Sequence, residues 1–191
     1  MAARSNVVVT EPADRVLVIT RMFDAPRELV FEAFTDPARL KSWWGPRGCT
    51  VISCEADPRA GGTWRITMRS PRVLPQFVHR HPINPETGLS HPRQSGAEVA
   101  ASDQSWIVER QRGVYQEVVK PQRLVFTYAF EDDAGRSLHQ TVVTLTFADE
   151  GGRTKLTLHQ AIFENVPARD DHVRGWTEAL EHLAEHLTRT I

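Results

Sequence analysis

The sequence predicts an α+β fold in which one long C-terminal helix lies against a curved, mostly antiparallel sheet. Near the end of the chain, apolar residues recur at helical spacing, and glutamates and histidines occupy the opposite face. Such an amphipathic helix must cover its apolar stripe with another element. Strand-like segments fill most of the chain between Val16 and Gln160, so a sheet is the expected cover. The stripe consists of Val173, Trp176, Leu180, Leu183 and Leu187.

The first elements are a strand over 16–23 and two short helices. Asp24 is expected to cap the first helix, with Pro26 in its first turn, where a missing N–H has no consequence. Asp36 starts a second helix in the same way, and Gly45 followed by Pro46 ends it.

The remaining strands are recognised by their alternation of apolar and polar residues and by the turns between them. Together with the first strand they make seven, which is an α+β order with an antiparallel meander. Their ranges are 49–57, 63–70, 113–119, 123–130, 139–147 and 154–161.

Two segments do not fit this regular pattern. Residues 1–13 are expected to form a flexible tail ahead of a single domain over 14–191. Residues 70–110 contain five prolines and no periodicity, which predicts an insertion that forms either a lid or a disordered loop.

Bulk properties exclude several classes of protein. The chain has 191 residues, of which 40% are hydrophobic and 25% are charged, and its net charge is −1. This charge gives no electrostatic reason to bind nucleic acid or an anionic membrane. No apolar run has the length of a membrane span, and no secretory signal is evident. Cys49 and Cys54 are expected on opposite faces of one strand, so a reduced, cytoplasmic protein is predicted.

Several segments, in order, resemble one known family. They include RMFDAPRELVFEAFTDPARLKSWWGP, AGGTWRITMRSP, GVYQEVVKPQRLVFTYAF and GWTEALEHLAEHL. Over about 14–69 and 110–190 the chain resembles the bacterial relatives of the activator of the heat-shock-protein-90 ATPase. That family belongs to the helix-grip superfamily, also called START-like or SRPBCC, which includes the birch-pollen allergen. The resemblance implies a seven-stranded antiparallel sheet around the C-terminal helix, with an internal cavity.

The alternation within each strand predicts which residues face that cavity, provided that no bulge inverts a strand. Glu117 and Gln160 are polar exceptions on an otherwise apolar face, so each is either paired, open to water or turned to a ligand. Trp44 belongs either to the core or to the cavity wall. The candidate ligand-binding residues are Trp44, Trp64, Ile66, Met68, Tyr115, Glu117, Phe126, Tyr128, Gln160 and Trp176.

The favoured function is binding of a hydrophobic or aromatic small molecule without catalysis, because no nucleophile motif, P-loop or dinucleotide fingerprint occurs. One alternative is a cyclase-like or hydrolase-like enzyme that uses Glu117 as acid or base; no catalytic residue beyond it is identified. A second is a co-chaperone that stimulates a heat-shock-protein-90 type ATPase. No cofactor is expected, and His79, His81 and His91 form too small a set for a metal site. The sequence leaves open whether the protein forms a homodimer.

Overall fold

The computed structural model describes residues 8–10, 14–71 and 106–190. A short strand comes first. The elements after it have the predicted order of one strand, two helices, six strands and a final helix. Their bounds are β1 Val8–Thr10, β2 Val16–Phe23, α1 Arg27–Ala33, α2 Pro37–Trp43, β3 Thr50–Ala56, β4 Thr63–Pro71, β5 Trp106–Val119, β6 Arg123–Glu131, β7 Thr141–Asp149, β8 Thr154–Ala161 and α3 Val166–Thr190.

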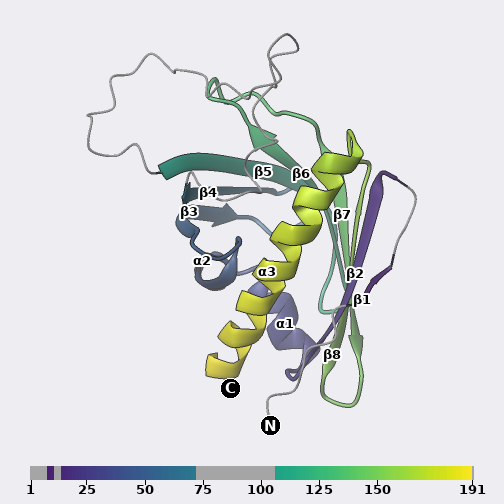
Figure 1. Cartoon of the computed structure of the whole chain (residues 1–191). Coiled ribbons are helices and arrows are strands. Elements are labelled where there is room, and N and C mark those ends of the chain that lie inside the picture. Colours follow the sequence, from purple (N-terminus) through teal and green to yellow (C-terminus); the bar gives the residue numbers. More distant parts are fainter. Residues whose placement is uncertain (1–7, 11–13, 72–105, 191) are drawn as a thin grey trace.

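All strands join one antiparallel sheet in the order β1-β2-β8-β7-β6-β5-β4-β3. The sheet curls around α3, and α1 and α2 lie beside that helix (Figure 1). β2 pairs with β8, so the first long strand lies next to the last one. The strands from β2 to β8 confirm the predicted seven-stranded helix-grip sheet. The three-residue β1 adds a further edge strand inside residues 1–13, for which the sequence predicts only a tail.

The long helix α3 covers the concave face of the sheet with the predicted stripe. Trp176, Leu180 and Leu183 are each at most 5% exposed. Val173 is only partly buried but packs against the same core. The prediction that this helix is the central element of the core is therefore confirmed.

The two short helices close one end of the core. Asp36 caps α2, since its Oδ1 accepts a hydrogen bond of 2.8 Å from the amide of Ala38. The expected cap of α1 is wrong: Pro26 holds the N-cap position and no side chain bonds there. Pro26 brings no amide N–H of its own to be satisfied at that position. Phe31 of α1 packs on Phe147 of β7 with ring centroids 5.3 Å apart.

The predicted insertion is shorter than the sequence suggests. β4 continues to Pro71 and β5 begins at Trp106, so residues 106–110 are strand and not irregular chain. Pro71 and Trp106 are partners in the ladder, because β4 and β5 keep pairing beyond the expected end of the hairpin. Residues 72–105, which make up most of the lid predicted over 72–108, lie outside the described residues.

Both cysteines face the core, contrary to the expectation that they point to opposite sides. In a regular strand Val51 and Cys54 would face opposite sides of the sheet. A register shift between Val51 and Ser53 inverts the rest of β3, so that both Val51 and Cys54 pack against the core. Cys49 lies just before the strand, where its Sγ is 3.2 Å from Oγ of Ser70, and the two cysteines form no disulfide. In the described parts of the chain, no helix is long and apolar enough to cross a membrane.

Candidate functional site

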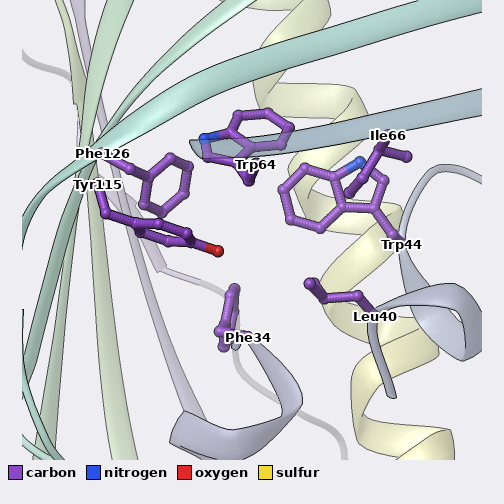
Figure 2. Close-up of a pocket in the computed structure, with 7 residues that line it drawn as sticks. All are labelled: Phe34, Leu40, Trp44, Trp64, Ile66, Tyr115 and Phe126. Atoms are coloured by element: carbon purple, nitrogen blue, oxygen red, sulfur yellow. The ribbon is translucent and has the colours of Figure 1, made fainter. Parts of the chain in front are cut away.

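The structure has a hollow between the sheet and the helices α1 and α2. Its cavity volume is only about 10 Å³, inside about 230 Å³ of space between atoms that includes open solvent. Figure 2 shows that the lining side chains converge from both sides on this space, with the oxygen of Tyr115 pointing into it. Its walls are formed by Phe34, Leu40, Trp44, Trp64, Ile66, Tyr115 and Phe126.

A second hollow lies against the N-terminal half of α3. Its cavity volume is about 40 Å³, inside about 400 Å³ of space between atoms that includes open solvent. Trp44 lines both hollows, so this single indole ring separates them. The second hollow is lined by Trp44, Gly45, Pro46, Met68, Gln111, Tyr128, Asp171, His172, Gly175, Trp176 and Ala179.

Trp44 is held by edge contacts with other aromatic rings. Its centroid lies 5.2 Å from that of Trp176 and 5.8 Å from that of Trp64. Trp64 in turn lies 5.5 Å from Tyr128 and 5.7 Å from Phe126. These are distances at which tilted and edge-to-face ring pairs attract each other. The aromatic rings therefore form one continuous wall from the first hollow to the second.

Trp44 and its neighbour Trp43 have different roles, although no pattern in the sequence distinguishes the two residues. The Trp43 indole donates to the carbonyl of Ala33 at 2.9 Å and is fully buried. The Trp44 indole donates to Oε1 of Gln111 at 2.8 Å and lines both hollows. Trp43 is thus a core residue, and Trp44 is the wall.

The indole N–H groups of the other two wall tryptophans also have buried partners. Trp64 donates to the carbonyl of Thr127 at 3.1 Å, and Trp176 donates to Oε1 of Gln160 at 2.7 Å. Because a buried donor without a partner is costly, these bonds fix the orientation of both rings.

Gln160 is paired inside the protein, which is one of the readings that the sequence leaves open. Its side chain is fully buried, and its Nε2 donates to Oγ1 of Thr141 at 2.8 Å. Both ends of the amide are used inside the protein. Gln160 thus orients Trp176 and lines neither hollow.

The prediction that Glu117 reaches into the cavity is wrong. The pairing of β5 with β6 shifts register between Tyr115 and Glu117, so one extra residue inverts the rest of the strand. Val118 now packs on the core. Glu117 instead pairs with Arg123 at 3.1 Å, and both side chains are 43% exposed.

The other predicted residues lie around the hollows, but in two groups. Trp64, Ile66, Tyr115 and Phe126 line the first hollow, while Met68, Tyr128 and Trp176 line the second. Sequence reasoning missed Phe34, Leu40, Gln111, Asp171, His172 and Gly175. Gln111 has the parity of Tyr115 before the shift, but it precedes the strand that the sequence predicts over 113–119.

A loop directly after Trp44 is tied to α3 by a set of polar contacts, which we call the Arg47 latch. The amide of Arg47 donates to Oε2 of Glu178 at 2.9 Å, and its guanidinium donates to Oε1 of Glu185 at 2.8 Å. Nδ1 of His182 lies 3.0 Å from the carbonyl of Gly45. Since Gly45 also lines the second hollow, the latch holds part of the wall in place.

The latch is expected to respond to pH through Glu185. The hydrogen bond and the charge of Arg47 hold the pKa of Glu185 below its ordinary value of 4.5. Stability from this pair is therefore present above the ordinary pKa and is lost as the pH falls through the lowered one. Arg47→Ala should raise the pKa of Glu185 toward its ordinary value, as measured by carboxyl NMR titration. Arg136→Ala, which breaks a separate pair with Asp132, is the matched control and should leave that pKa unchanged.

Comparisons with known proteins agree with this architecture. The family model described as "Activator of Hsp90 ATPase homolog 1-like protein" matches residues 24–76 and 91–188. A crystal structure of a protein from Rhodobacter sphaeroides is similar at 21% identity and a TM-score of 0.70, covering 97% of this chain and 100% of that one.

Two further crystal structures are similar over most of their length. An AHSA1 protein from Silicibacter pomeroyi matches at 24% identity and a TM-score of 0.67, covering 92% of this chain and 99% of that one. A protein from Chromobacterium violaceum matches at 25% identity and a TM-score of 0.62, covering 91% and 96%. None of the curated proteins compared matches the chain.

Proposed function

The chain belongs to the family of Activator of Hsp90 ATPase homolog 1-like proteins, and we propose that it binds one aromatic or otherwise apolar small molecule between its sheet and its helices. The helix-grip superfamily that contains this family often binds hydrophobic ligands. The proposal concerns binding and does not include a reaction.

The observation that carries this proposal is the position of Trp44. Its ring separates two hollows whose other lining residues differ but whose aromatic rings contact one another. A rotation of Trp44, or a shift of the loop that follows it, would join the two spaces into one site. Sites for small organic molecules are concave, mainly apolar and supplied with few polar groups.

Binding requires such a movement. Trp44 is 8% exposed, and Trp64, Tyr115 and Phe126 are less exposed still. A ligand must therefore displace a wall before it reaches the first hollow. We take the loop held by the Arg47 latch as the element that moves, because the paired side chains of Arg47 and Glu185 are 58% and 50% exposed.

The enzymatic alternative loses its proposed residue, since Glu117 lies on the opposite face of β5. Burial raises the pKa of the Cys54 thiol to about 11, so this thiol is protonated and a poor nucleophile at neutral pH. Within the described ranges, no three potential metal ligands gather. An acid–base role would have to rest on Asp171 and His172 in the second hollow.

His172 gives that alternative a specific form. Its Nδ1 lies 2.9 Å from the carbonyl of Ala168, which can only accept, so Nδ1 carries the proton and the neutral ring has its lone pair on Nε2. Asp171, however, is engaged in an ion pair with Arg174.

The co-chaperone alternative rests on the family name and is tested by adding the protein to a heat-shock-protein-90 ATPase assay. Cys49 and Cys54 form no disulfide, which agrees with the reducing cytoplasm that we propose as the location of the protein.

The proposal is tested by native mass spectrometry of protein purified from its own host. We expect a small molecule that is retained in the native spectrum and lost on denaturation. Gly175→Leu should reduce the retained fraction, because a side chain at Gly175 begins on the wall of the second hollow with no atom within 4 Å. Thr188→Leu adds the same side chain at an exposed position of α3 and is the control.

Two results would contradict the proposal. One is a native spectrum without bound molecule, combined with no displacement of an apolar fluorescent dye by small aromatic compounds. The other is an equal loss of the bound molecule in both leucine variants, which would point to an effect on α3 and not to the hollow.

A further inference from the structure

The first hollow has one polar side-chain group that the protein does not use. Its seven lining residues carry three polar side-chain atoms, on Trp44, Trp64 and Tyr115. Both indole N–H groups have internal partners. The Tyr115 hydroxyl makes no hydrogen bond to any described residue, although the residue is only 3% exposed.

The backbone around Tyr115 holds this hydroxyl in position. The amide of Tyr115 donates to the carbonyl of Gly62 at 2.8 Å, and its carbonyl accepts from Gly61 at 2.8 Å. The ring packs edge-on to Phe126 at a centroid distance of 6.0 Å. Figure 2 shows the hydroxyl projecting into the space between Phe34, Leu40 and Trp44. The group is thus pre-oriented, which reduces the entropy lost when a ligand binds to it.

The electrostatic surroundings favour a neutral ligand. No lining residue carries a charge, so an ionised ligand would lose its hydration without gaining a counter-ion. Burial, together with the nearby Cys54 and Asp57, raises the pKa of Tyr115, so the phenol keeps its proton. Asp57 would also repel an anion. A phenol that keeps its proton donates a hydrogen bond to an acceptor oxygen.

We propose that Tyr115 donates the recognising hydrogen bond to a neutral acceptor oxygen, such as a ketone carbonyl, on an aromatic ligand held in the first hollow. This inference rests on the proposed binding function and specifies the class of ligand. It selects uncharged aromatic carbonyl compounds over pure hydrocarbons and over aromatic carboxylates.

The test uses three probes that share one bicyclic skeleton: 1-indanone, indane and indane-1-carboxylate. Their dissociation constants are measured by ligand-observed NMR with wild-type protein and with Tyr115→Phe. We expect the wild type to bind 1-indanone about five-fold more tightly than indane, which corresponds to one net hydrogen bond. In Tyr115→Phe this preference should disappear while indane still binds. Indane-1-carboxylate should bind the wild type most weakly.

The outcomes separate this inference from the proposed function. If indane and 1-indanone bind both proteins with the same preference, the role of Tyr115 is overturned while the pocket stands. If the carboxylate binds most tightly, the neutral class of ligand is overturned. If no probe binds the wild type, both the proposed pocket and the inference fail. A urea unfolding curve of Tyr115→Phe, expected to match the wild type because the hydroxyl has no internal partner, shows that the variant is folded.

Discussion

Trp176→Ala is expected to lower the free energy of unfolding by about 3–5 kcal/mol, the usual range for removing a large core aromatic ring. Trp176 is 5% exposed and connects α3 to the sheet through its bond to Gln160. The alanine variant leaves a cavity and also deprives Oε1 of Gln160 of its donor. Urea unfolding followed by circular dichroism measures the loss.

A second tryptophan provides the matched control. Trp106 is only partly buried and stacks on the guanidinium of Arg69 at 4.7 Å. An exposed contact of this kind is worth about 0.5–1 kcal/mol, so Trp106→Ala should have a much smaller effect. Equal losses in the two variants would refute the central role assigned to Trp176.

The elements of this fold could be predicted because each depends on nearby residues. The stripe from Val173 to Leu187 identifies α3, and the strict alternation around Trp64 identifies β4. Turn residues mark most strand ends. These signals are local in sequence, and the tertiary structure reinforces them.

The details that failed depend on pairing between distant segments. The extra residue between Tyr115 and Glu117 is revealed only by the ladder with β6. The start of β5 at Trp106 likewise depends on pairing with Pro71. No local pattern shows that Gln160 bonds to Trp176 or that Gln111 bonds to Trp44.

The same difference between local and distant signals explains why only some of the residues that line the hollows could be predicted. Residues whose parity follows an unbroken strand, such as Trp64, Phe126 and Tyr128, lie on the walls of the hollows. The division of the space by Trp44 could not be predicted, because it depends on how α2 meets α3 and the sheet. Gly113 is a second example, since its importance follows from a side chain far away in the sequence.

Gly113→Ala is expected to destabilise the fold by roughly 3 kcal/mol or more, from overpacking and from the loss of a buried hydrogen bond. A Cβ at Gly113 would lie 1.7 Å from the carbonyl oxygen of Thr127 and 2.4 Å from Nε1 of Trp64. The missing side chain is what lets the Trp64 indole cross β5 and reach that carbonyl. In a strand, glycine often marks such a close approach.

Gly175→Ala is the matched control, because a Cβ there meets no atom within 4 Å and the residue lies inside α3. In a helix interior this change should stabilise the protein by about 0.5–1 kcal/mol. The two variants differ from the wild type by the same methyl group, so opposite signs in urea unfolding would isolate the crossing at Gly113. Tryptophan fluorescence should also shift in Gly113→Ala, since Trp64 must leave its buried acceptor. An alanine at Gly113 that leaves both stability and fluorescence unchanged would mean that Trp64 is not anchored across β5, and the wall between Trp44 and Tyr128 would then lack its central support.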